Sequence, residues 1–243
     1  MISNLLLFLL AAGLPYFVFL EKNEKFSSKL IFLISGFSLF CAIVLSLFIH
    51  NEHYMVLVLV SFASSIFAIY KATKTTNFYK LGYYLIYINA PFFVLFEEKG
   101  ALYSLSLLVA LIGIFLIGYN YEKNYGSANY HYIRGITLTT PYIGTFMTIY
   151  LISVALYPPF PNSLFFLNYV LLSDLNFIGY LIVIVLFFGH FLLAMKVVKE
   201  SLFGKPNPNI HYVELTSKEK LAHIGVVALL LVLSIFGLKE ILI

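Results

Sequence analysis

Residues 137–174 read TLTTPYIGTFMTIYLISVALYPPFPNSLFFLNYVLLSD, a helix-length apolar run with Pro141 in its first turn. The run then meets three prolines, Pro158, Pro159 and Pro161. They remove backbone donors and clash with the preceding turn, so a helix is expected to stop there. The next apolar piece, 164–172, is too short to cross a hydrocarbon layer of about 30 Å. We therefore predict one discontinuous transmembrane helix over 137–173, with an unwound middle that is buried in protein or lines a polar path.

The composition excludes a soluble domain. Of 243 residues, 61% are hydrophobic and 11% are charged, and a soluble domain of this length cannot bury so much apolar surface. No basic residue precedes the apolar run 2–20 and no small-x-small cleavage site is visible, so this run is expected to be a span and not a signal peptide. The single cysteine, Cys41, lies inside a span and excludes a disulfide within the chain.

The apolar runs predict an all-α, polytopic transmembrane bundle that forms a single integral membrane domain over 1–243. We expect about eight spans, including the discontinuous one: 2–20, 30–49, 54–70, 79–96, 101–119, 137–173, 177–196 and 221–238. The connection 197–220 is the longest, and its Pro-Asn-Pro run cannot be helical.

The distribution of basic residues predicts the topology. With eight spans, one side of the membrane receives thirteen of the fifteen lysines and arginines, and the other side receives only Lys99 and Lys239. Basic loops face the cytoplasm, so both termini are expected outside.

Ionisable side chains are costly in lipid and usually mark function, yet the predicted spans hold almost none. Deep in the hydrophobic layer only His190 remains. It is interpreted either as a proton-relay or cofactor-contacting group, or as a neutral imidazole that is hydrogen-bonded to a neighbouring helix. The other histidines fall in loops or at span ends, which argues against a bis-histidine haem. We expect no catalytic residue, no metal site and no cofactor.

Several motifs stand in a recognisable order. They are SSIFAIYKATKTTNFYKLGYY at 64–84, ALYSLSLLVALIGIFLIG at 101–118, IRGITLTTP at 133–141, ALYPPFPNSLFF at 155–166 and SLFGKP at 201–206. This order resembles the second half of the antiporter-like, proton-translocating subunits of respiratory complex I, membrane-bound hydrogenases and Mrp antiporters. The resemblance covers residues 54–240, and it implies a bacterial or archaeal cytoplasmic membrane. Residues 1–49 form two plain apolar spans in place of the family's other half.

The departures from the family concern its proton path. The family's His and Lys on the helix that matches 101–118 fall near Ser104, Leu108 and Ile112. The charged residue just after the helix break falls near Phe166 or Leu167, and Lys74 is the one matching lysine that remains. The candidate proton path is thus reduced to Lys74 and His190.

We therefore expect a structural or accessory membrane-arm subunit of a complex-I-like or hydrogenase-like redox-driven ion pump. Its partners would be other membrane subunits, including a full-length antiporter-like one, and lipids, with no nucleic acid. The chain alone is not expected to be an enzyme, although it could belong to an NADH:quinone oxidoreductase or hydrogenase. Two alternatives are an independent small proton or cation transporter, and a membrane anchor for a redox or inorganic-carbon-uptake enzyme with 197–220 as docking surface.

Overall fold

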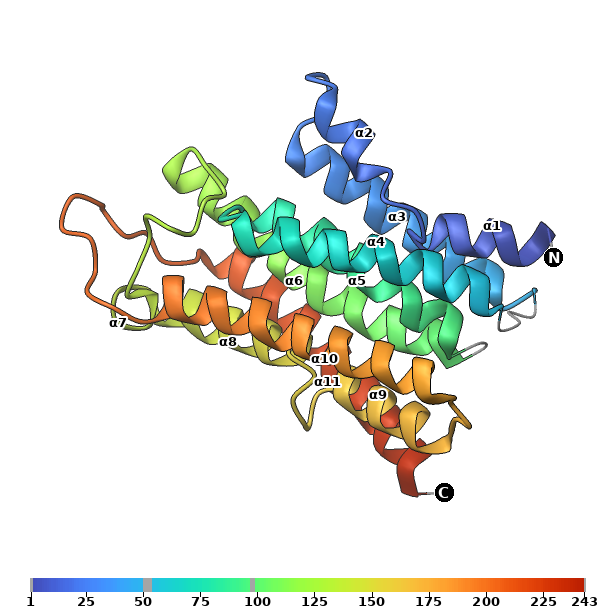
Figure 1. The fold of residues 1–243 in the computed structure, drawn as a ribbon. Helices are drawn as coiled ribbons and strands as arrows, with labels where there is room; N and C mark the ends of the chain where they lie inside the picture. Colours follow the sequence, from blue (N-terminus) through green and yellow to red (C-terminus); the bar gives the residue numbers. More distant parts are fainter. Residues whose placement is uncertain (1, 50–53, 97–98, 243) are drawn as a thin grey trace.

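The computed structural model describes residues 2–49, 54–96 and 99–242, which form a bundle of helices (Figure 1). Five described helices, α3, α4, α6, α11 and α10 with its π-helical end, are long and apolar enough to cross a membrane. The prediction of an all-α polytopic bundle is confirmed. The helices are α1 Ile2–Leu10, α2 Phe17–Lys22, α3 Ser28–Ser46, α4 Met55–Lys74, α5 Phe78–Leu95, α6 Gly100–Tyr125, α7 Ile136–Thr139, α8 Pro141–Val154, α9 Pro161–Leu172, α10 Phe177–Val197, the π-helical turn Val198–Leu202 and α11 Ser217–Leu242.

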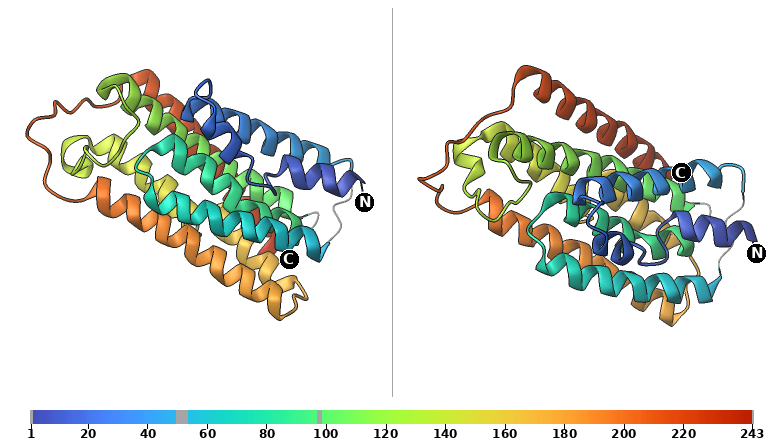
Figure 2. Two further views of the ribbon diagram at one scale, coloured as in Figure 1. Left: turned by 45° about the horizontal axis from the view of Figure 1, so that its top comes forward. Right: turned by 90° about the horizontal axis from the view of Figure 1, so that it is seen from above.

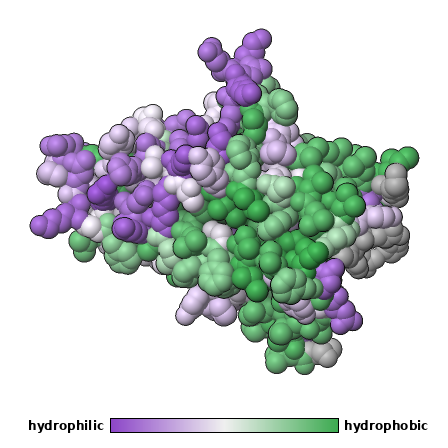
Figure 3. All heavy atoms as spheres, viewed as in Figure 1, coloured by the Kyte–Doolittle hydropathy of each residue, from purple (hydrophilic) through white to green (hydrophobic). Residues whose placement is uncertain are grey.

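Helix α5 is the centre of the bundle. All of its residues except Lys80 are buried, and it packs against α3, α4, α6 and α10. A helix that is apolar on every side must be surrounded by other helices or by lipid, and α5 is surrounded by helices. The outer helices α10 and α11 expose leucine, isoleucine and phenylalanine side chains instead. Figure 3 shows an apolar surface across the middle of the molecule, on the side where α10 lies in Figure 1.

The two ends of the bundle differ in polarity. Both termini lie at one end, and the loops 126–135 and 203–216 lie at the other (Figures 1 and 2). The hydrophilic surface in Figure 3 gathers at the loop end. Two ion pairs of 2.8 Å, Lys29–Glu122 and Lys123–Glu219, join α3 to α6 and α6 to α11 there.

The prediction of one continuous helix over 2–20 is wrong. Helix α1 ends at Leu10, and α2 begins only at Phe17. Ala12 takes a left-handed conformation with φ of 65°, and the amide of Gly13 donates to the carbonyl of Phe8 at 2.9 Å. A left-handed residue followed by this bond is the Schellman ending of a helix. Pro15 then lacks the amide that would let the helix resume at once. The range 2–22 is therefore a second interrupted segment.

The interruption predicted in 137–173 is present, with an additional break at its start. Thr140 separates the single turn α7 from α8, which begins at Pro141. Helix α8 ends at Val154, and α9 begins at Pro161, where a proline is favoured because the first helical amide has no partner. The connection 155–160 contains a cis peptide between Pro158 and Pro159.

Candidate functional site

The connection between α8 and α9 lies on the surface of the bundle. Tyr157 is 62% exposed, and Pro158 and Pro159 are exposed as well. Figure 1 shows this loop projecting from the lower face of the bundle. The unwound segment was expected to be buried within protein or to line a polar path, and within this chain its tip is not buried.

The length of α9 predicts that the loop lies within the hydrocarbon layer. Helix α9 has 12 residues and leads from the break to the end of the bundle that carries the termini. At 1.5 Å per residue, it places the break about 18 Å from that end. Irregular backbone does not face lipid at such depth, because its polar groups would lack partners. The surface around Tyr157 therefore requires a protein neighbour or a polar environment.

Buried side chains fix the inner side of the same break. The hydroxyl of Ser153 donates to Oδ1 of Asn162 at 3.3 Å, which joins the last turn of α8 to the first turn of α9. Both residues are fully buried. Among the described residues, the amide nitrogen of Asn162 has no hydrogen-bond partner. This unpaired donor is one of several polar atoms inside the bundle that a water molecule could satisfy.

Pro91 creates a second polar position, in the middle of α5. A proline within a helix cannot donate to the carbonyl four residues earlier, here that of Tyr87. The hydroxyl of Ser65 on α4 donates to that carbonyl at 2.8 Å. Two residues after Tyr87, the side-chain amide of Asn89 donates to the hydroxyl of Ser104 on α6 at 2.8 Å. Side chains of α4 and α6 thus form hydrogen bonds with polar groups of α5 close to Pro91.

His190 lies fully buried beside this region. Its ring stacks on that of Phe92 with centroids 6.1 Å apart. Nδ1 is 3.0 Å from the carbonyl of Leu186 on the same helix, so Nδ1 carries the proton and Nε2 presents a lone pair. Among the described residues Nε2 has no hydrogen-bond partner. One of the two interpretations of His190 requires a hydrogen bond to a neighbouring helix; in the structure its hydrogen bond goes to the preceding turn of its own helix.

Lys74 is at the end of α4, far from such burial. It is exposed, donates to the hydroxyl of Tyr70 and lies 4.1 Å from the centre of that ring. Lys196 on α10 donates to the carbonyls of Thr73 at 2.8 Å and Thr75 at 2.6 Å, so it caps the same end of α4. Lys196 follows His190 by six residues, which corresponds to about 9 Å along a helix. The structure does not bring Lys74 and His190 into contact.

The positions at which the sequence resemblance predicts a proton path are apolar or singly hydrogen-bonded. Ser104 is buried and holds Asn89, whereas Leu108 is buried in apolar surroundings. Ile112 is 42% exposed on the outer side of α6. Phe166 stacks on Phe187 with centroids 5.7 Å apart. These side chains carry no charge, and only Ser104 among them can exchange a hydrogen bond.

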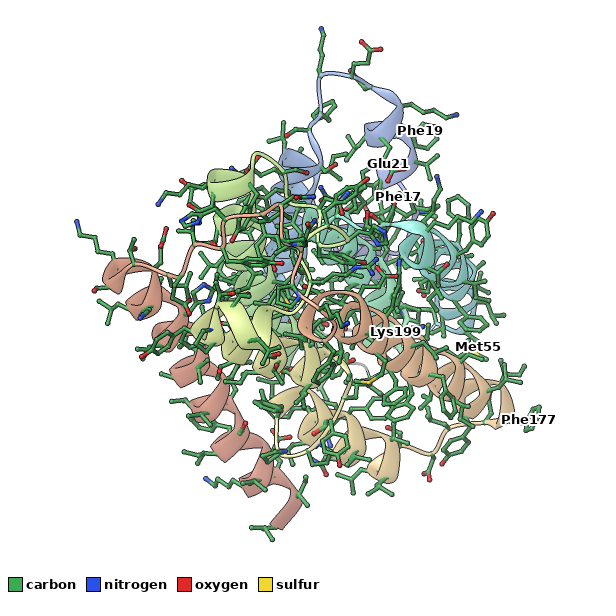
Figure 4. All side chains as sticks on the ribbon, turned by 90° about the vertical axis from the view of Figure 1, so that its left-hand side faces the viewer. Phe17, Phe19, Glu21, Met55, Phe177 and Lys199 are labelled. Atoms are coloured by element: carbon green, nitrogen blue, oxygen red, sulfur yellow. The ribbon has the colours of Figure 1, made fainter. Side chains whose placement is uncertain are left out.

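A partly buried charged cluster around Glu21 was not predicted from the sequence. The carboxylate of Glu21 on α2 accepts a hydrogen bond from Tyr83 at 2.6 Å and another from Tyr84. Lys71 of α4 lies 3.7 Å from the same carboxylate. Figure 4 shows Phe17 and Glu21 on the side of α2 toward the bundle, with Phe19 on the outer side. Because 2–20 was expected to be one span, Glu21 fell just outside it. The tyrosine-rich sequence of α5 was the one available signal, since buried tyrosine hydroxyls need hydrogen-bond acceptors.

A second histidine is also buried. His223 on α11 has Nδ1 2.9 Å from the hydroxyl of Tyr150 on α8, and its ring stacks on Phe146 with centroids 4.9 Å apart. It was expected at a span end, and it lies in the second turn of α11. His223 therefore joins α8 to α11. His190, in contrast, lies on α10 and contacts α5.

The two loops at the polar end support each other. The hydroxyl of Tyr212 donates to the carbonyl of Arg134 and accepts from the amide of Asn207, both at 2.8 Å. Tyr130 is buried and donates to the carbonyl of Thr75 at 2.9 Å. Burial raises the pKa of Tyr130, so this donor remains protonated. In the ranges that the structure describes, no group of three His, Cys, Asp or Glu could hold a metal ion.

Comparison with known proteins identifies the fold. No protein-family model and no curated protein matches the chain. A solved structure of the Mrp complex from Dietzia sp. DQ12-45-1b contains a similar chain, with a TM-score of 0.58 and 14% identity. The similarity covers 87% of this chain and 51% of that chain, so this chain spans about half of its length. The protein is thus a multi-pass, all-α membrane protein that shares the fold of about half of a chain in an Mrp complex.

Proposed function

We propose that this chain is a structural subunit of a multi-subunit, ion-translocating membrane complex of the Mrp, complex I or hydrogenase type. The exposed break between α8 and α9 is the observation that carries the proposal. A loop at this depth needs a protein neighbour or a polar environment, because lipid cannot satisfy its backbone carbonyls, and a neighbouring subunit supplies either one. The shared fold with a chain of an Mrp complex supports the same class of assembly.

Uncharged side chains along α6 support the structural role. Ser104, Leu108 and Ile112 stand where the family's proton path has titratable groups, and none of them changes charge. Glu21 and Lys71 lie toward the loop end and are held by tyrosines and by each other. The chain would therefore support the pumping neighbour without a complete charge path of its own. Its basic loops would face the cytoplasm and both termini the outside.

Purification of the tagged chain in mild detergent, with mass spectrometry of the co-purifying proteins, tests the proposal. We expect an antiporter-like subunit and subunits of its complex. A photo-crosslinking residue at Tyr157 should form an adduct with one of these proteins. Ile235 on α11, which is 68% exposed, is the control position on a different face. A chain that migrates alone, with no protein adduct from position 157, would contradict the proposal.

An independent proton transporter is the second candidate, and the free lone pair of His190 Nε2 favours it. In this case the purified chain alone would conduct protons in liposomes, and His190→Phe would abolish the flux. His223→Phe is the matched control, since His223 is also buried but lies between α8 and α11. A flux that persists after replacement of both His190 and Lys74 would exclude this mechanism.

A further inference from the structure

A groove lies between α6, α9 and α11, at the end of the bundle that carries both termini. Its volume is about 530 Å³, and its lining residues are Leu102, Phe165, Leu233, Phe236, Lys239 and Glu240. This volume falls within the range of about 300–1,000 Å³ that is usual for ligand sites. Four of the six lining residues are apolar, and the two charged ones are neighbours in the last turns of α11.

Helix packing explains the shape of the groove. A Cβ at Gly237 would lie 3.0 Å from Cβ of Leu164, so α11 contacts α9 closely at this glycine. Leu233, Phe236 and Glu240 follow each other at spacings of three and four residues, which places them on one face of α11. Phe236 is 58% exposed and forms an open edge of the groove. The groove therefore opens on the surface that faces the membrane, with its apolar wall deeper than its charged rim.

The charges at the rim are of both signs. Lys239 supplies an ammonium group, and Glu240 supplies a carboxylate that accepts a bond from Asn168 at 3.4 Å. Lys99 stands beside the same wall, because its ammonium lies 5.5 Å from the ring of Tyr169, which stacks on Phe165. Lys99 and Lys239 are the two basic residues that the topology assigns to this side of the membrane. Both thus lie near one groove.

We propose that this groove binds a zwitterionic phospholipid with an ethanolamine head group. Lys239, supported by Lys99, binds the phosphate, and Glu240 accepts hydrogen bonds from the ammonium of the head group. One acyl chain lies along Leu102, Phe165, Leu233 and Phe236. An anionic head group such as that of phosphatidylglycerol has no ammonium group to pair with the carboxylate of Glu240. A choline head group carries no N–H donor for this carboxylate.

Lipid binding to the purified, delipidated full chain tests the proposal by native mass spectrometry. The probes are phosphatidylethanolamine, phosphatidylglycerol and phosphatidylcholine with identical acyl chains. We expect saturable binding with preference for phosphatidylethanolamine. Lys239→Ala should weaken it about five-fold, as expected for the loss of one partly exposed ionic contact. Lys218→Ala is the matched control, because it removes the same charge from the opposite end of α11.

Two further variants separate head-group recognition from packing. Glu240→Gln should remove the preference over phosphatidylcholine while phosphate binding persists. Leu233→Trp should fill the groove and lower the binding of every lipid, with an unchanged unfolding temperature showing that the bundle is intact. A preference for phosphatidylglycerol, non-saturable binding, equal binding by Lys239→Ala and Lys218→Ala, or a crosslink from position 236 to a protein subunit would each overturn the proposal. The result is independent of whether partner subunits co-purify.

Discussion

The two interrupted segments of this protein begin in the same way and are completed differently. Ala12 after α1 and Leu156 after α8 both take left-handed conformations, with φ of 65° and 60°. In each case the amide of the next residue donates to a carbonyl five residues earlier, from Gly13 to Phe8 and from Tyr157 to Ile152. Two Schellman endings are thus formed without glycine at the left-handed position.

The chain segments after these two helix endings are held by different contacts. After Leu156, prolines stop the chain from continuing as a helix and start α9, so neighbouring residues define the second break. After Ala12, the short helix α2 is held by Glu21, whose partners lie in α4 and α5. The second break is therefore readable from local sequence, while the position of α2 after the first break depends on contacts between residues that are distant in sequence.

Removal of the carboxylate at Glu21 is expected to have the largest effect. Glu21→Ala leaves Tyr83, Tyr84 and Lys71 without their common partner, and we expect a loss of about 3 kcal/mol from hydrogen bonds to a charged group. Thermal unfolding in detergent measures it. Glu24→Ala, an exposed carboxylate two residues past α2, should change stability little. Equal unfolding temperatures for the two variants would mean that Glu21 does not hold the first break.

Glycine at the two left-handed positions should have unequal effects on stability. Leu156 is buried, so Leu156→Gly loses its packing, and after relief of the left-handed strain we expect a net loss of about 2 kcal/mol. Ala12→Gly loses one methyl group and gains a similar relief, so its effect should stay within about 0.5 kcal/mol of zero. Chemical denaturation of the two variants in the same detergent decides this. A large loss at Ala12 would show that its methyl group contributes packing energy well beyond that relief.

A double-mutant cycle of Ser65 and Pro91 measures the hydrogen bond from Ser65 to the carbonyl of Tyr87. Ser65→Ala leaves the carbonyl of Tyr87 without a donor, and we expect a loss of about 1.5 kcal/mol. In the Pro91→Ala background the restored amide can bond to that carbonyl, so the same serine substitution should cost less. Unfolding free energies of the four proteins give the coupling. If the two substitutions change the unfolding free energy additively, Ser65 does not compensate for the amide that Pro91 lacks.

The smallest effect is expected at the start of α9. Pro161→Ala keeps the helix but loses the restriction of the unfolded chain, and we expect a loss below about 1 kcal/mol. The same measurement applies, with Leu156→Gly as reference for a disrupted break. A loss as large as that of Leu156→Gly would show that Pro161 determines the break more strongly than its position in the first turn of α9 indicates.

Local sequence predicted most of the fold and little of the candidate site. The apolar runs predicted the long helices, because a stretch of about twenty apolar residues is stable across a membrane. The prolines predicted the break, because a proline lacks the amide that continues a helix. The first break was missed, although Pro15 lies within the apolar run 2–20. His190 was found because a histidine is conspicuous among apolar residues, but its bond to Leu186 was not predictable.

The sequence by itself determined that the chain crosses the membrane several times as helices. In lipid only helices and closed barrels satisfy all backbone hydrogen bonds, and continuous apolar runs of about twenty residues indicate helices. It also determined where prolines interrupt them. Only the tertiary structure decided that Glu21 meets Tyr83 and Lys71, that Ser65 serves the carbonyl freed by Pro91, and that Tyr157 faces outward. The physical reason is that these contacts join residues on different helices, and the packing angle of each helix pair sets which side chains face each other.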